Sequence, residues 1–207
     1  MGGRSLIFYF GIQIFLALAP VTAGRGENLV PESAFRVWLE PSFMHSPLRG
    51  PLPGAQKTVM GGGFQVDGEL KPGAKTTLES LKLTWSEFEA KARRNASEEL
   101  ARLHPRYERD ARKSIIYAAL ESDRPVVSCA VLAPGFLGLW KDSLGEKVLV
   151  VVPNQSTAFI FPRLASDYLS YAPMVLRANR ESTYPVSLEV FEVSFTGWRC
   201  LGAYEEP

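Results

Sequence analysis

Hydrophobic and polar positions in the middle of the chain repeat with the period of an α-helix. Over residues 85–103, apolar side chains recur at intervals of three and four residues and therefore share one face of a helix. Two overlapping pairs have the spacing of the capping box that begins such a helix, either Ser86 with Glu89 or Thr84 with Glu87. The pattern predicts one amphipathic helix whose start is set by one of these pairs.

Shorter apolar segments have the composition of strands and short helices. Strands are expected in five segments, each bounded by turn residues: residues 114–120, 147–152, 157–161, 187–193 and 198–204. Two more helices are expected, one from Val126 toward Trp140 and one over residues 171–180. This order of elements predicts an α+β fold, a single domain in which about three helices pack a largely antiparallel sheet.

The segment that precedes this domain has a different composition. Residues 24–63 contain five prolines, which interrupt any long helix or central strand. Within it, residues 34–39 alternate as a short strand would. The glycine run 61–63 is expected to be a flexible turn into a strand over residues 64–66, because a phosphate-binding loop would continue into a helix. The chain therefore divides into an irregular Pro/Gly-rich arm over residues 24–63 and an α+β domain over residues 64–207.

The first 23 residues have the three parts of a signal peptide. A short basic segment ending at Arg4 is followed by an apolar run over residues 6–20 and by Val21-Thr22-Ala23. The small side chains at the end of this segment fit cleavage before Gly24. We expect a mature chain of residues 24–207 that is secreted or periplasmic, with no transmembrane segment once the signal peptide is removed.

Composition and charge exclude several classes of function. The 207 residues include 23 basic and 22 acidic side chains, and a net charge of +1 argues against a nucleic-acid partner. A hydrophobic content of 46% is enough to build a core. Two cysteines and two histidines are too few for the common zinc sites, and no acidic cluster has calcium-loop spacing, so neither a metal nor another cofactor is expected.

The two cysteines allow two interpretations. In an oxidising compartment, Cys129 and Cys200 can form a disulfide that joins the middle helix to the last strand. Alternatively, both are small buried side chains, as free cysteines often are. The sequence leaves both open.

Catalytic motifs are weakly represented. No Gly-x-Ser-x-Gly segment occurs, and the only histidines, His45 and His104, have no serine or cysteine beside them in a recognisable pattern. Each histidine is interpreted as a surface residue, although either one with a carboxylate or with Cys129 would make a small hydrolase.

The order of several segments resembles a known family. They are Ala92-Arg93-Arg94-Asn95, residues 128–132, residues 150–155 and Tyr184-Pro185-Val186-Ser187. Over residues 83–204 they are similar to the uncharacterised bacterial YtpQ-like family of unknown function. Ser156 stands where that family commonly has a charged residue. The family has no established reaction, so the resemblance implies an α+β fold and no catalytic residue.

These observations favour an exported, non-catalytic binding domain. Its partner is expected to be another protein or an envelope component. Asn154 and Gln155 are the candidate binding residues, because they lie in the turn between two apolar strands, and turns on rigid scaffolds often carry recognition residues. The competing hypothesis is the secreted hydrolase that uses His104 or His45.

Overall fold

A computed structural model describes residues 30–165 and 167–204 of the chain. Its strands are β1 (Phe35–Pro41), β2 (Arg49–Gly50), β3 (Thr58–Val66), β4 (Glu69–Pro72), β5 (Arg106–Arg109), β6 (Ile115–Glu121), β7 (Val148–Asn154), β8 (Thr157–Pro162), β9 (Glu189–Ser194) and β10 (Gly197–Ala203). Its α-helices are α1 (Thr77–Leu81), α2 (Trp85–Arg102), α3 (Val127–Ala130) and α4 (Ala172–Arg180). Short 3-10 helices are η1 (Glu32–Ala34), η2 (Ser42–Met44), η3 (Leu137–Leu139) and η4 (Tyr168–Tyr171). The predicted signal peptide lies outside the described residues.

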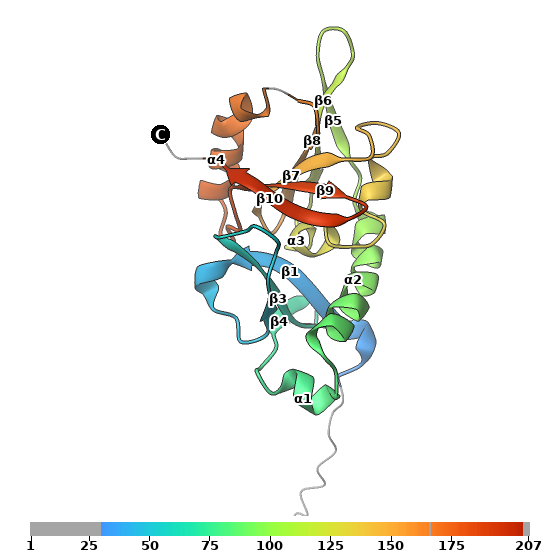
Figure 1. Ribbon diagram of the computed structural model, residues 1–207, viewed down its shortest axis with the longest axis vertical. Coiled ribbons are helices and arrows are strands. Elements are labelled where there is room, and N and C mark those ends of the chain that lie inside the picture. The colour runs from blue at the N-terminus through green and yellow to red at the C-terminus, as the bar shows by residue number, and fades with distance from the viewer. Residues whose placement is uncertain (1–29, 166, 205–207) are drawn as a thin grey trace, which may run out of the picture.

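The strands form two antiparallel sheets, which confirms the predicted α+β class. The large sheet has six strands in the order β10-β9-β7-β8-β6-β5, and the small sheet has four, with β3 pairing to β1, β2 and β4. In Figure 1 the small sheet lies below the large one, and α2 runs along one side of the molecule beside both. β1 also contacts α2 and α3, so these helices join the two halves.

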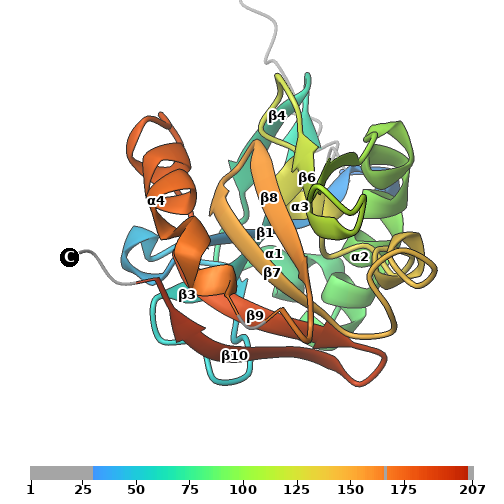
Figure 2. The same ribbon diagram turned by 90° about the horizontal axis from the view of Figure 1, so that it is seen from above.

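The large sheet is covered on both faces, which explains the unbroken apolar runs in its central strands. Val148 and Val150 belong to the core shared with α2, α3 and the small sheet, whereas Leu149 and Val151 belong to a second core beneath α4. Seen from above, α4 lies on one side of β7 and β8, and α2 and α3 lie on the other (Figure 2). Successive side chains on a strand point to opposite faces, so a two-sided core requires apolar residues throughout.

The described part of the expected arm is more regular than its composition predicts. Residues 35–41, 49–50 and 58–66 are strands of the small sheet, and the glycine run 61–63 lies inside β3 rather than in a turn. A Cβ at Gly63 would lie 2.1 Å from the carbonyl oxygen of Lys71 on β4. Glycine is thus needed there for close approach of neighbouring backbones, not for flexibility.

The three predicted helices are found with shorter bounds, and α1 was not predicted. Of the two possible capping boxes for α2, the structure has the one formed by Thr84 and Glu87, in which the Glu87 carboxylate accepts a hydrogen bond from the Thr84 backbone N–H at 2.9 Å. The middle helix is reduced to α3 and the separate turn η3. α4 begins with Pro173 in its first turn, as expected.

A buried carboxylate fastens the two sheets to each other. Glu189, at the start of β9, accepts hydrogen bonds from the backbone N–H groups of Gln56 and Lys57 at 2.8 and 3.1 Å. The Thr58 hydroxyl, at the start of β3, donates to its other oxygen at 2.6 Å. Because Glu189 is only 4% exposed, these donors replace the water that an ionised carboxylate would otherwise need. This tie sets the position of the small sheet against β9 and the segment before it.

Among residues 30–165 and 167–204, no helix combines the length and the apolar character needed to cross a membrane.

Candidate functional site

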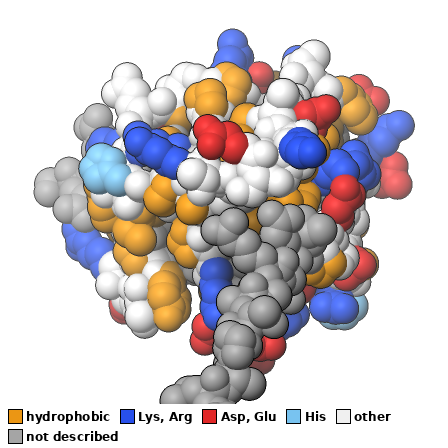
Figure 3. Space-filling view, turned by 90° about the horizontal axis from the view of Figure 1, so that it is seen from below, with side chains coloured by type: hydrophobic (Ala, Val, Ile, Leu, Met, Phe, Trp, Pro, Cys, Tyr) orange, Lys and Arg blue, Asp and Glu red, His pale blue; other side chains and the backbone are white. Residues whose placement is uncertain are grey.

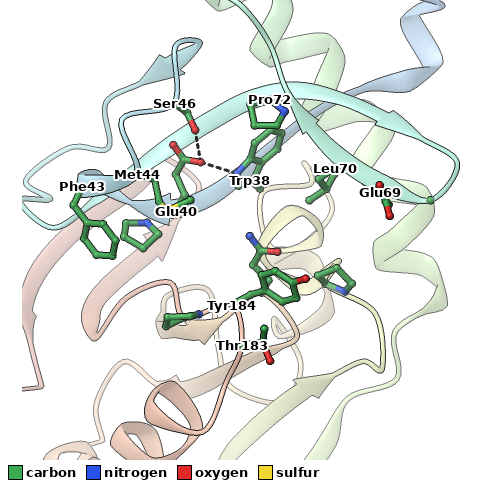
Figure 4. Close-up of a pocket in the computed structure, with 15 residues that line it drawn as sticks. Trp38, Glu40, Phe43, Met44, Ser46, Glu69, Leu70, Pro72, Thr183 and Tyr184 are labelled. Atoms are coloured by element: carbon green, nitrogen blue, oxygen red, sulfur yellow. Dashed lines mark hydrogen bonds between the residues drawn. The ribbon is translucent and has the colours of Figure 1, made fainter.

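A groove of about 560 Å³ lies between the small sheet and the segment that joins α4 to β9. Figure 4 shows Trp38, Leu70 and Pro72 on the wall formed by the small sheet, with Tyr184 and Thr183 across from them. The other residues that line it are Glu40, Pro41, Phe43, Met44, Ser46, Gly68, Glu69, Pro125, Gln155 and Pro185. The groove is therefore assembled from segments that are far apart in the sequence.

The wall formed by β1 contains a buried carboxyl group. Trp38 and Glu40 are two residues apart on β1 and share one face, and the Trp38 indole N–H donates to Glu40 Oε2 at 2.9 Å. The Ser46 hydroxyl donates to the same oxygen at 2.8 Å (Figure 4). The other oxygen, Oε1, is buried and has no hydrogen-bond partner among the described residues. A buried polar atom that has no hydrogen-bond partner lowers the stability of the fold.

Gly61 makes this arrangement possible. It lies directly across from Trp38 in the pairing of β1 with β3. A Cβ at this position would lie 2.5 Å from Glu40 Oε2 and 2.8 Å from the Trp38 indole nitrogen. Any larger residue would therefore displace the carboxyl group, and the glycine run serves the site as well as the sheet.

Three exposed apolar side chains border the groove. Phe43 is 70% exposed, Met44 60% and Tyr184 58%. We call these residues the rim. Large apolar side chains that are exposed together and surround a hollow are typical of binding sites.

The groove is acidic although the chain as a whole is almost neutral. Its lining contains Glu40 and Glu69 and no lysine, arginine or histidine. Within the described part of the chain, neither glutamate forms an ion pair with a basic side chain. By contrast, on the face seen from below, acidic and basic side chains are mixed with apolar ones (Figure 3). Two carboxyl groups without a basic partner among the described residues, one of them bonded to Trp38, distinguish the groove from that surface.

Of the two binding residues predicted from the sequence, only Gln155 lines the groove. It is partly buried, and its backbone N–H donates to the carbonyl oxygen of Tyr184 at 3.0 Å. Asn154 is 6% exposed, and its amide donates to the carbonyl oxygen of Ala178 at 2.8 Å while its Oδ1 accepts from the backbone N–H of Ser156. The polar groups of Asn154 are thus occupied within the protein, and Gln155 remains the binding prediction.

The possible disulfide is not formed. Cys129 and Cys200 are both free thiols. Cys129 is 1% exposed in the core, and burial raises the pKa of its thiol to about 12. Cys200 is on the edge strand β10, where its backbone N–H donates to the carbonyl oxygen of Pro53. The alternative interpretation, a small buried side chain, describes Cys129.

The histidines do not take part in the groove. His45 and His104 are both exposed, and neither lines it, although Met44 and Ser46 on either side of His45 do. Because Cys129 is a neutral thiol at physiological pH, it is not available as a nucleophile. The groups proposed for the hydrolase are therefore not brought together at this site.

In the described ranges, no group of three or more His, Cys, Asp or Glu side chains is placed to hold a metal ion.

Comparison of the chain with models of known families, with curated proteins and with solved structures yields no match. The resemblance to the YtpQ-like family therefore stays a prediction.

Sequence reasoning missed most of this site because Trp38, Glu40 and the rim residue Phe43 belong to the segment interpreted as an irregular arm. One signal was available. The expected strand over residues 34–39 needed a partner, and the glycine run 61–63 is the kind of sequence that allows a neighbouring strand to carry large side chains.

Proposed function

We propose that this chain is an exported, non-catalytic binding domain whose partner docks in the groove. The observation that carries the proposal is the convergence of the three rim residues, Phe43, Met44 and Tyr184, on one hollow. They come from η2 and from the α4–β9 segment, so chain proximity alone does not account for their grouping.

Physical chemistry supports binding at this position. When a partner covers exposed apolar surface, the burial of that surface stabilises the complex by roughly 25 cal/mol per Å². A volume of about 560 Å³ is within the range of known ligand pockets. The carboxyl groups and Gln155 supply a few polar contacts that would orient the partner. Without a histidine or cysteine in the lining, the groove favours recognition over nucleophilic chemistry.

The proposal is tested by a fragment screen on the ¹⁵N-labelled protein. Cationic, neutral and anionic fragments are added singly, and changes in amide chemical shifts are mapped on the structure. We expect hits to shift the amides of residues 38–46 other than Pro41, of residues 69–71, and of Thr183 and Tyr184. Tyr184→Ala should weaken these hits by about tenfold, as the loss of an aromatic anchor often does.

Phe195→Ala is the matched control, because Phe195 is 72% exposed and lies outside the groove. The fragments should bind Phe195→Ala with the same affinity as they bind the unchanged protein. Shifts that cluster elsewhere, or equal weakening by both variants, would show that the groove is not the binding site.

A further inference from the structure

We infer that the groove binds the basic side chain, lysine or arginine, of an extended polypeptide segment of the partner. This inference rests on the proposed function and adds the chemical class of the ligand. Charge provides the first support, because the lining holds two carboxyl groups and no basic side chain. A cation is attracted to such a site and an anion is repelled.

The buried carboxyl group of Glu40 is only partly satisfied within the protein. Its Oε2 already accepts two hydrogen bonds, from Trp38 and Ser46, whereas Oε1 has no partner among residues 30–165 and 167–204. Ammonium and guanidinium groups are pure donors, and their hydrogen bonds to carboxylates are stronger than neutral ones. Oε1 is closed to solvent, so a basic group at this wall would act on the Glu40 carboxyl group through its charge and would reach Oε1 only if the wall opened.

The aromatic rings favour a cation with an apolar stem. Trp38, Phe43 and Tyr184 line the groove, and a cation over an aromatic face is stabilised by the ring quadrupole. Leu70 and Pro72 add apolar surface on the wall of the small sheet, as Figure 4 shows. Lysine and arginine bury their methylene stems against such surfaces while the charged end contacts polar groups.

The shape of the surface indicates a polypeptide rather than a free amine. A second hollow of about 310 Å³ adjoins the groove and shares Pro41, Phe43 and Pro185 with it. It is lined by Lys57 and contains no acidic residue, so it does not repeat the charge of the groove. Two adjoining hollows exceed the space that one side chain needs, and the second has room for a neighbouring residue of the same segment.

The test uses seven-residue peptide mixtures with one fixed central residue and flanks randomised among Ala, Val, Pro, Ser and Thr. The central residue is Lys, Arg, norleucine or Glu, and binding to the protein is followed by NMR titration. We expect the Lys and Arg mixtures to bind about tenfold more tightly than the norleucine mixture, because their charge is attracted to the carboxyl groups of the groove. Their binding should weaken as the salt concentration rises, because salt screens this attraction. The Glu mixture should bind least.

Charge-removing variants locate the effect. Glu69→Gln should weaken binding of the Lys mixture about threefold. It should not change the fold, because Glu69 is exposed. Glu40→Gln should weaken this binding more, and circular dichroism reports whether this buried change is tolerated. Glu98→Gln, an equally exposed charge on α2 outside the groove, is the control and should have no effect.

The outcomes separate this inference from the proposed function. If norleucine peptides bind in the groove as tightly as Lys peptides, or if Glu69→Gln and Glu98→Gln act alike, the cation inference is overturned and the binding proposal stands. If N-acetyl-lysine methylamide binds as tightly as the Lys mixture, the inference that the ligand is a polypeptide segment is overturned, and a single amine is the ligand instead. If no mixture shifts the groove amides and the fragments also fail, both proposals are overturned.

Discussion

Individual side chains hold parts of this protein together, and Glu189 is a buried example with three hydrogen-bond donors around its carboxyl group. It is buried at the junction of the two sheets and accepts from two backbone N–H groups and the Thr58 hydroxyl. Removing the carboxyl group would leave three buried or partly buried donors without an acceptor. Each such loss costs about 1–3 kcal/mol, and the costs of neighbouring groups do not add fully.

We therefore predict that Glu189→Ala lowers the free energy of unfolding by about 3 kcal/mol, measured by urea denaturation. Glu189→Gln, which keeps one acceptor oxygen, should cost less. The control is Glu181→Ala, an exposed glutamate at the end of α4. A loss of under about 0.5 kcal/mol in Glu189→Ala, the range of ordinary surface substitutions, would contradict the role of Glu189 as a tie between the sheets.

Asn154 and Gln155 are neighbours with opposite expected behaviour. Asn154→Ala removes two hydrogen bonds in a buried turn and should cost about 1–3 kcal/mol of stability. Gln155→Ala should change stability by less than about 0.5 kcal/mol, because the hydrogen bonds that Gln155 makes to Val127, Ser128 and Tyr184 come from its backbone. It should nevertheless weaken binding of the Lys peptide mixture. If Gln155→Ala instead unfolds the protein while bound peptide is unaffected, Gln155 is structural and its binding role is to be withdrawn.

The two thiols should differ in reactivity. Burial raises the pKa of Cys129 to about 12, so at pH 8 almost none of it is thiolate, whereas Cys200 is partly exposed. We expect one thiol to react with Ellman's reagent in the folded protein and a second only after unfolding in urea. Cys200→Ser should abolish the first reaction, and Cys129→Ser should leave it unchanged. A disulfide in the purified protein would give no reaction in either state.

At the scale of elements, the start of α2 depends on a charge and is therefore sensitive to pH. Hydrogen bonds from the backbone N–H and hydroxyl of Thr84 lower the pKa of Glu87 below its usual value. Because the folded-state pKa is the lower one, this contribution to stability is present above the unfolded pKa of about 4.3 and is lost as the pH falls through the folded value.

We predict that unfolding free energies at pH 7 and pH 3 differ less in Glu87→Gln than in the unchanged protein. Thr84→Ala, which removes the hydroxyl, should also reduce the difference and lower helix stability at pH 7. Glu98→Gln on the same helix is the control. An equal pH dependence in the unchanged protein and Glu87→Gln would show that the capping box makes no measurable contribution.

Elements with local patterns were predictable, and those that depend on partners were not. α2, the β7–β8 and β9–β10 hairpins and α4 were expected near their observed bounds, since helical periodicity, turn residues and apolar runs mark them. β5 was not expected, because Arg106–Arg109 is a charged edge strand that is held by pairing with β6. The part of β3 up to Gly63 was missed, although a strand was expected over residues 64–66, because glycine is unfavourable in an isolated strand and is required only by contact with β1 and β4.

At the scale of the whole molecule, one core joins the two sheets. It contains Val37 and Met60 from the small sheet, Ile160 and Phe191 from the large sheet, and Phe88 from α2. Residues that share one core lose their contacts together, so the described chain should unfold as a single cooperative unit.

We expect the urea transitions followed by tryptophan fluorescence and by far-ultraviolet circular dichroism to coincide. Phe191→Ala, which empties space in the shared core, should shift both transitions together and cost about 3–5 kcal/mol. The exposed Phe195→Ala should shift neither. Two separate transitions, or protection from hydrogen exchange lost in the large sheet alone, would show that the small sheet is an independent unit.

The sequence by itself determined the α+β class and most elements of the large sheet, because amphipathic periods, caps and turns are encoded in neighbouring residues. It also placed Gln155 in a turn with recognition potential. Only the tertiary structure decided that the described part of the expected arm contributes strands to a second sheet, that the cysteines stay apart as free thiols, and that Glu40, Glu69, Gln155 and the rim face one groove. Those features depend on contacts between segments distant in the chain, and local patterns carry no record of such contacts.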